Sequence, residues 1–375
     1  MKMDKIINLR HTLHKNAELS HNEKETSKIL KEYLIPLKPD YLEDVGYGFF
    51  IVFDSKKEGP VSMFRSDIDA LPIEESNDFE YRSKNINRAH LCGHDGHMAI
   101  AVYLAEKISK NKPQRGKTII LFQPAEEVGE GAKQVLESEK FLSLNPNYVF
   151  GLHNIPGYRK SSIIIKKGSF ASASRGMVIK LFGKQSHAGE PEKGITPVFA
   201  VERIIGGFRK EIERKDYYRD FHNLTIVHIN IGEAAFGTSP GYGEVLVTLR
   251  TALNSDMEKL VDRCENIIRS ICEEEKLKFE IDYKEIFPAT INDDYCVDMV
   301  KEVAKSSNLE TIEIDTPFKW SEDFSYFTNR YKGSFFGLGS GVDTPNLHNQ
   351  CYNFPDDIIE SGGEIFFNLY EKIHR

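Results

Sequence analysis

The hydrophobic pattern of residues 1–160 alternates between helix-like and strand-like segments. Residues 21–37 and 97–111 carry apolar side chains at helical spacing, with charged side chains on the other face. Short apolar runs bounded by turn residues are typical of buried strands, and they occur at 48–53, 61–69, 118–123 and 148–153. This alternation predicts an α/β domain built on a largely parallel sheet.

The pattern changes near Gly168. Strands are predicted at 174–189, 224–232, 244–252 and 278–286, and amphipathic helices at 197–214 and 257–276. Their β-α-β-β-α-β order is that of a ferredoxin-like α+β unit. Helical patterns resume at 295–307 and 358–375. We therefore expect one α/β domain formed by 1–170 and 287–375, with a satellite domain, 171–286, inserted into it.

Composition narrows the classes of protein that remain. The chain has 375 residues, 40% of them hydrophobic and 28% charged, which is typical of a globular protein. Its formal net charge of −8 argues against a nucleic-acid partner. No run of about 18 apolar residues predicts a membrane span, and the first residues lack the pattern of a signal peptide. Five widely spaced cysteines make a poor disulfide framework, so we expect a cytoplasmic protein.

The segment AHLCGHDGH (89–97) concentrates metal-binding side chains. Cys92 and His94 flank Gly93, whose backbone freedom lets both side chains turn to one side. A thiolate and an imidazole suit zinc and related metals. A structural zinc site would need two more closely spaced ligands, and no local signature of a cysteine nucleophile is present. By itself the loop leaves a metal site and a buried turn as alternatives.

Two acidic pairs follow predicted strands. Asp67 and Asp69 end one strand, where they could stabilise a turn or orient a metal-ligating histidine. Glu126 and Glu127 stand at an apparent helix start, where acidic residues often only complement the helix dipole. A hydrolytic metal site, however, needs one carboxylate on the metal and another as general base, and adjacent glutamates supply both.

Two further histidines lie beside predicted strand ends, His153 in GLHNIP and His348 in PNLHNQCYNF. Each alone is more often a structural residue. Because ligands of open α/β sheets bind at the carboxyl ends of the strands, their convergence with the loop and with the acidic pairs favours one metal site.

Several motifs together resemble the M20 metallopeptidase family over essentially the whole chain. The closest branch is that of aminoacylases and N-acyl-amino-acid amidohydrolases, which includes hippurate hydrolases, N-acetyl-diaminopimelate deacetylases and auxin-conjugate hydrolases. The motifs, in chain order, are FRSDIDALPIEE, HLCGHDGHMA, FQPAEEVGEGAK, GLHNIP, QSHAGEP, SEDFSYF and NLHNQCYNF.

The resemblance implies a metallohydrolase catalytic domain with two divalent metal ions and a satellite domain that serves as lid and dimerisation unit. The implied metal ligands are Cys92, His94, Glu127, His153 and His348. Glu126 is implied as general base and Asp67 as a supporting carboxylate. His187, in the SHAG motif, matches a histidine that reaches the active site of a dimer mate and steadies the oxyanion. His97 is not among the implied ligands, and we expect a structural residue at a helix start.

Substrate recognition is where the sequence departs from the family. Residues 235–245 replace the segment that usually carries an asparagine for the substrate carboxylate. Arg250 could take over that contact, although an arginine on a strand is more often an ion-pair partner. Asn154, the neighbour of His153, is a second candidate for substrate binding.

Three functions are therefore open. The first is an N-acyl-L-amino-acid amidohydrolase, the second a metallo-dipeptidase or carboxypeptidase with the same site, and the third a non-catalytic scaffold, against which the intact Glu126 and ligand set argue. Zinc is the favoured metal, with manganese, cobalt or nickel as alternatives. We expect a homodimer formed through the satellite domain, and no nucleic-acid or membrane partner.

Overall fold

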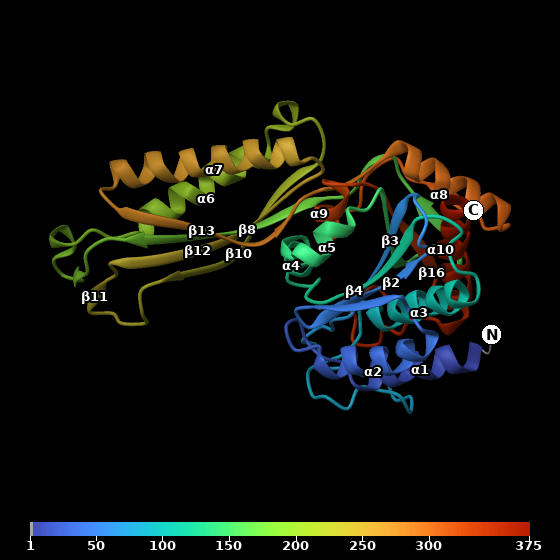
Figure 1. Ribbon diagram of the computed structural model, residues 1–375. Coiled ribbons are helices and arrows are strands. Elements are labelled where there is room, and N and C mark those ends of the chain that lie inside the picture. Colours follow the sequence, from blue (N-terminus) through green and yellow to red (C-terminus); the bar gives the residue numbers. More distant parts are fainter. Residues whose placement is uncertain (1–2) are drawn as a thin grey trace. The chain divides into compact units, whose positions relative to one another are not determined.

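The computed structural model describes residues 3–375, which divide into two compact units (Figure 1). Unit 1 comprises the chain up to Phe170, Thr290–Thr316 and Asp323–Arg375, and unit 2 comprises Ala171–Ala289 and Pro317–Glu322. The sequence pattern alone places the return to the first unit at 287 and does not reveal the short segment 317–322. This segment belongs to unit 2 because the Ser172 amide donates to the carbonyl of Phe318 (3.0 Å).

Unit 1 is built on an eight-stranded sheet of order β1-β2-β4-β3-β5-β16-β6-β15. Its strands are β1 (Tyr41–Val45), β2 (Gly48–Asp54), β3 (Val61–Asp67), β4 (Lys117–Gln123), β5 (Tyr148–Pro156), β6 (Ile163–Ile165), β15 (Thr311–Glu313) and β16 (Lys332–Gly341). The central strands β4, β3, β5 and β16 are parallel, whereas β1, β2 and β6 pair antiparallel with a neighbour. The predicted, largely parallel α/β sheet is confirmed. A separate pair joins β7 (Gly168–Ala171) to β14 (Thr290–Asn292).

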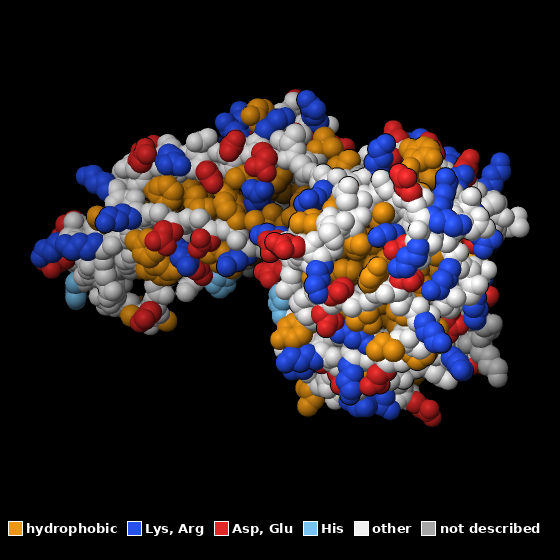
Figure 2. All heavy atoms as spheres, viewed as in Figure 1, with side chains coloured by type: hydrophobic (Ala, Val, Ile, Leu, Met, Phe, Trp, Pro, Cys, Tyr) orange, Lys and Arg blue, Asp and Glu red, His pale blue; other side chains and the backbone are white. Residues whose placement is uncertain are grey.

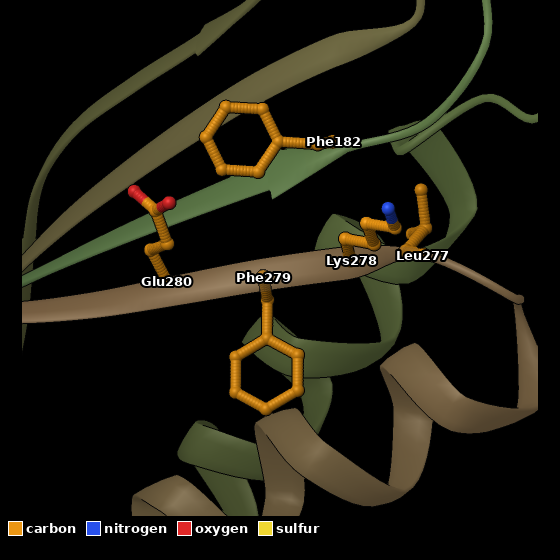
Figure 3. A pocket seen from close by; sticks show the side chains of 5 residues that line it. All are labelled: Phe182, Leu277, Lys278, Phe279 and Glu280. Atoms are coloured by element: carbon orange, nitrogen blue, oxygen red, sulfur yellow. The ribbon is translucent and has the colours of Figure 1, made fainter.

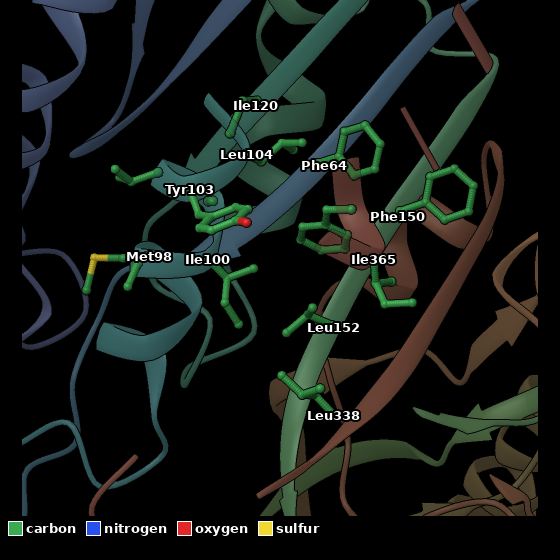
Figure 4. Close-up of a cluster of buried hydrophobic side chains, with 14 of the residues drawn as sticks. Phe64, Met98, Ile100, Tyr103, Leu104, Ile120, Phe150, Leu152, Leu338 and Ile365 are labelled. Carbon is green, nitrogen blue, oxygen red and sulfur yellow. The ribbon is translucent and has the colours of Figure 1, made fainter. Parts of the chain in front are cut away.

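Helices cover both faces of this sheet, which explains why its strands read as continuous apolar runs. The helices are α1 (Met3–Lys15), α2 (Lys24–Leu34), α3 (His94–Lys110), α4 (Gly131–Glu137), α5 (Glu139–Leu144), α8 (Asp294–Ser306), α9 (Ser325–Thr328) and α10 (Ile359–His374), with 3-10 turns at Ile35–Leu37 and Asp356–Ile358. On one face, Phe64 packs on Phe366 of α10 in a core that α3 also fills (Figure 4). On the other face, Phe50 contacts Phe141 of α5.

Unit 2 has the predicted ferredoxin-like order. Its elements are β8 (Ala173–Phe182), α6 (Val198–Ile212), β10 (His222–Ile231), β12 (Tyr242–Thr251), α7 (Asn254–Glu274) and β13 (Lys278–Phe287), with a small pair β9 (Ser186–His187) and β11 (Thr238–Ser239) and 3-10 turns at Pro191–Lys193 and Lys215–Tyr217. The four long strands form an antiparallel sheet of order β10-β12-β8-β13. Helices α6 and α7 lie over one face of it (Figure 1).

The surface of the two units carries both signs of charge. Figure 2 shows acidic and basic side chains interspersed on the visible face, and pairs such as Arg203 with Glu275 (2.7 Å) neutralise one another locally. In unit 2, Phe182 and residues 277–280 line a pocket where β8 ends and β13 begins (Figure 3). Within residues 3–375, no helix combines the length and the apolar character that a membrane crossing requires.

Candidate metal centre

The predicted site residues of unit 1 gather at the carboxyl ends of its central strands. Asp67 is the last residue of β3, and Glu126 and Glu127 follow β4. His153 lies within β5, which continues past it to Pro156, and His348 follows β16. Open α/β sheets bind their ligands at this edge, so the topology gathers residues that are far apart in sequence.

The loop before α3 brings Cys92 and His94 to the same edge. Gly93 between them has a φ of +89°, in the left-handed region that favours glycine. A Cβ at Gly93 would lie 2.5 Å from Oδ1 of Asn154. The loop therefore passes close against β5 only because residue 93 has no side chain.

His94 presents one ring nitrogen to the glutamate pair. Its Nδ1 lies 2.9 Å from the carbonyl oxygen of Asp69, which can only accept, so Nδ1 carries the proton. The Nε2 atom lies 3.6 Å from Oε1 of Glu127 and 4.0 Å from Oε2 of Glu126. Both His94 Nε2 and Glu127 Oε1 are buried, and neither has a hydrogen-bond partner within residues 3–375. Unpaired buried polar atoms are costly, and a bound cation would satisfy both.

His153 and His348 complete the cluster from two other segments. Nδ1 of His153 donates to the carbonyl of the next residue (2.9 Å), and its Nε2 lies 3.4 Å from Sγ of Cys92. The amide of His348 donates to the carbonyl of Leu91 (2.9 Å), which fixes this residue beside the cysteine loop. Nε2 of His348 lies 3.8 Å from Oε2 of Glu127.

The donor atoms of the five predicted ligands fall in two overlapping groups. Cys92, His94 and His153 form one, and Cys92, Glu127 and His348 form the other, with the donor atoms of each group within 4.8 Å of one another. Thiolate, imidazole and carboxylate are together a donor set for zinc and similar transition metals. Two groups that share Cys92 fit a pair of neighbouring cations, and the structure brings all five predicted ligands together.

Buried negative charge dominates the electrostatics of the cluster. Burial, and then the nearby glutamates and Asp67, raise the pKa of the Cys92 thiol. Burial opposes protonation of His94, but Asp67 and the other carboxylates outweigh it and raise the pKa of His94 to about 10. Burial also raises the pKa of Glu127 to about 7, although the charge of His94 opposes this. Bound divalent cations would instead lower the pKa values of these groups, since a coordinated thiol loses its proton.

Asp67 lies at the centre of a hydrogen-bond network that includes His97. Nδ1 of His97 lies 2.7 Å from Oδ1 of Asp67, and the Asn154 amide donates to Nε2 of His97 (3.2 Å). Nη1 of Arg65 donates to the other oxygen of Asp67 (2.7 Å). Sequence reasoning missed this role of His97. The available signal was its position one helical turn after His94, which places both rings on the same face of α3.

The two candidates for substrate binding have partners within their own units. Asn154 is fully buried, and its Nδ2 donates to the hydroxyl of Tyr352 (2.5 Å). In unit 2, Nη1 of Arg250 donates to the carbonyl of Lys319 and to Oγ of Ser321, both at 3.0 Å. Contact with a substrate stays a prediction for both residues. The burial of Asn154 favours a role in holding Tyr352.

A buried charge cluster supports the metal-binding loop from the side of α1. Oδ2 of Asp95, the residue after His94, accepts hydrogen bonds from Nη1 of Arg10 (2.7 Å) and from Nδ1 of His14 (2.9 Å). Nε2 of His14 lies 3.1 Å from Oε1 of Glu75. Burial opposes protonation of His14, but Asp95 and Glu75 outweigh it and raise its pKa to about 9. His14 is therefore a buried imidazolium between two carboxylates.

This cluster predicts a loss of stability at alkaline pH. Because the pKa of His14 in the folded state exceeds the unfolded value, its stabilisation is complete below about pH 6.5. The stabilisation is lost as the pH rises through about 9. The shift corresponds to a free energy on the order of 3 kcal/mol. Urea unfolding of the wild type and of His14→Gln at pH 6, 7.5 and 9 measures it. An identical pH dependence in both proteins would refute the assignment.

Comparison with known proteins places this geometry in a family. Residues 63–372 match peptidase family M20/M25/M40. Over 370 residues the chain is 30% identical to the hippurate hydrolase of Campylobacter jejuni, covering 97% of this chain and 95% of the relative. It is 30% identical to an N-acetyl-L-cysteine deacetylase of Bacillus subtilis (99% and 88% covered). It is 31% identical to thermostable carboxypeptidase 2 of Saccharolobus solfataricus (96% and 93% covered).

Solved structures share the fold. A dinuclear metal binding peptidase of the M20 family from Bacillus subtilis superposes with a TM-score of 0.84 at 24% identity, over 99% of this chain and 98% of that chain. The aminopeptidase PepT of Bacillus cereus superposes with a TM-score of 0.76 at 13% identity, over the whole of both chains. Because most of the chain matches the family model and full-length relatives are 30% identical, the chain belongs to peptidase family M20/M25/M40.

Proposed function

We propose that this protein is a metal-dependent amidohydrolase that cleaves the amide bond of an N-acyl-L-amino acid. The observation that carries the proposal is the convergence of the donor set around His94 Nε2 and Glu127 Oε1, two buried atoms that no other group in the described part of the chain hydrogen-bonds. The residues that would hold two divalent cations are Cys92, His94, Glu127, His153 and His348. Zinc suits this set, and manganese, cobalt or nickel are alternatives.

Glu126 is the proposed general base. When bound, the cations would act as Lewis acids that acidify water and polarise the amide carbonyl. Glu126 is 6% exposed, its Oε1 accepts from the Asp323 amide (3.4 Å), and its Oε2 points toward His94. The Glu126 carboxylate can take a proton from the attacking water as the water oxygen bonds to the carbonyl carbon. Glu126 then gives the proton to the amine nitrogen as the C–N bond breaks.

His187 of unit 2 is proposed to stabilise the oxyanion. Nδ1 of His187 accepts a hydrogen bond from the Gly189 amide (3.0 Å), so Nε2 is the ring nitrogen that can donate a proton to an oxygen. We propose that His187 acts in the active site of a second copy, within a homodimer formed through unit 2. The edge strand β10 supports such an interface, since its Val227 and Ile229 side chains are exposed.

An N-acyl amino acid is the favoured substrate because hippurate hydrolase and N-acetyl-L-cysteine deacetylase are among the full-length relatives. A peptide substrate is the second candidate, because thermostable carboxypeptidase 2 is equally similar. Both substrates place an amide bond next to a carboxylate, so the same site would serve either reaction.

A substrate panel tests the proposal. Purified protein is assayed with N-acetyl and N-benzoyl amino acids and with dipeptides, before and after a chelator, and again after adding back zinc, manganese or cobalt. We expect hydrolysis of the acyl amino acids, loss of activity with the chelator and recovery with metal. Dipeptide hydrolysis alone would favour the second candidate. Activity that survives removal of all metal would overturn the metal-dependent mechanism.

A further inference from the structure

The segment that joins α1 to α2 contacts the two segments of the candidate site that carry Asp69 and the Glu126–Glu127 pair. We call residues 17–23 the N-terminal clasp. The Ala70 amide donates to the carbonyl of Glu18 in the clasp (2.8 Å), and Oγ of Ser20 donates to Oδ2 of Asp69 (2.7 Å). The clasp therefore holds the segment that follows β3, although it contributes no predicted ligand itself.

Glu23, the last residue of the clasp, holds the segment that follows β4. Its carboxylate is fully buried, and Oε1 accepts a hydrogen bond of 2.8 Å from the amide of Ala125. Ala125 has a φ of +52°, a left-handed conformation that costs free energy for a residue with a side chain. The Ala125 carbonyl in turn accepts from the amides of Glu130 and Gly131 (3.2 and 3.0 Å). Both ends of this strained residue are fixed by hydrogen bonds.

The conformation of Ala125 decides where the next two side chains point. Glu126 and Glu127 follow it directly, and the amide of Glu127 donates to Oδ2 of Asp69 (3.0 Å). The same Asp69 oxygen accepts from Ser20, while the Asp69 carbonyl fixes the ring of His94. The clasp thus holds the base and its neighbouring ligand through Glu23, and the opposing histidine through Ser20.

We propose that Glu23 is a positioning residue for the hydrolytic reaction, which acts by holding the Ala125 amide so that Glu126 and Glu127 face His94. This inference rests on the proposed function. The hydrogen bond from the Ala125 amide needs an acceptor oxygen at the distance from the backbone that a glutamate side chain provides, but it does not need a negative charge. Burial and the nearby Asp69 raise the pKa of Glu23 to about 7, so a neutral acceptor is compatible with this position.

Two conservative substitutions separate reach from charge. Glu23→Gln keeps the reach and the acceptor oxygen but removes the charge, and we expect kcat within about 3-fold of wild type. Glu23→Asp keeps the charge and withdraws the acceptor by about 1.5 Å. Because Asp is favoured at a helix N-cap, the position that Glu23 occupies in α2, we expect this variant to fold. Its kcat should fall by about 10- to 100-fold with little change in KM.

Cobalt binding provides a measurement besides activity. Titration followed by visible absorption should give a dissociation constant about 10-fold higher in Glu23→Asp than in wild type, and near wild type in Glu23→Gln. Ser62→Ala is the matched stability control. It removes a buried hydrogen bond of 2.7 Å to His374 at the opposite end of β3, and it should lower the melting temperature without changing kcat or cobalt affinity.

The outcomes separate the two levels of the inference. A greater impairment of the Gln variant would show that charge rather than reach matters, and equal impairment of the two variants would show that reach has no special weight. Either result would overturn the positioning role. Full activity and affinity in Glu23→Asp would overturn it as well. If the wild type binds cobalt but cleaves no amide substrate, the proposed function fails, while the order of cobalt affinities still tests the role of Glu23.

Discussion

Glu126→Gln should lower kcat by about 10²- to 10⁴-fold and leave the bound metal nearly unchanged. The amide of glutamine keeps the size and the buried position of the side chain but cannot accept the proton of the attacking water. Glu127, at the next position, keeps its carboxylate for the cation, so both groups that contain Cys92 stay intact. The loss should therefore appear in turnover and not in metal content.

Steady-state kinetics and metal analysis of the same preparations measure both quantities. Glu130→Gln is the matched control, because Glu130 lies in the same turn but is exposed and pairs with His21 (2.9 Å). It should keep wild-type activity. Retention of full activity in Glu126→Gln would refute the assignment of the general base. A loss of metal parallel to the loss of activity would instead make Glu126 a ligand.

Cys92→Ser should weaken metal binding by about 100-fold or more, because losing a direct ligand should cost at least as much as losing a residue that only orients one. Sγ of Cys92 belongs to both donor groups, so its loss affects both proposed cation positions. A serine hydroxyl has nearly the same size, but it gives up its proton far less readily than a thiol and is a harder, poorer ligand for zinc. Activity at limiting metal should fall in parallel and return in part at high metal concentration.

Competition with a chromogenic chelator measures this affinity. Cys296→Ser is the matched control, because Cys296 is also buried but lies in α8, outside both donor groups. It should lower the melting temperature and leave the metal affinity unchanged. Unchanged affinity in Cys92→Ser would mean that the thiol is not a ligand.

Unit 2 shows which features of the fold the sequence pattern predicts and which it does not. Its β-α-β-β-α-β order was readable because each strand alternates and each helix is amphipathic, and the sheet order β10-β12-β8-β13 follows from that topology. The short segment 317–322 was not readable as part of this unit. It joins through backbone hydrogen bonds such as that of Ser172, which leave no pattern in the side chains.

The position of strand β16 is not evident from its sequence pattern, and the reason lies in packing. Its sequence, KGSFFGLGSG, is rich in glycine, which normally argues against a strand interior. A Cβ at Gly339 would lie 2.0 Å from the carbonyl oxygen of Arg159, so a close approach of two backbones requires glycine there. Local propensity does not show this constraint, because it comes from a distant segment.

At the candidate site, the identity of the residues was predictable and their connections were not. The motifs named Cys92, His94 and Glu127, and the fold brings these side chains together. The sequence could not show that the backbone carbonyl of Asp69 lies closer to Nδ1 of His94 (2.9 Å) than the Asp69 carboxylate does (3.5 Å). The spacing of His97 from His94 puts it on the site's side of α3, but the sequence could not show that its hydrogen-bond partner is Asp67, at the end of β3.

The place of β16 in the sheet has a consequence for biosynthesis. This strand lies between β5 and β6, although both precede it in the chain by many residues. Until β16 has been synthesised, the edge of β5 that pairs with it has no hydrogen-bonding partner. Unpaired strand edges promote association between nascent chains. Stalled or prematurely terminated translation products should therefore be prone to aggregate and depend on chaperones. Such products would also lack His348, so they would not contain the full set of proposed metal ligands.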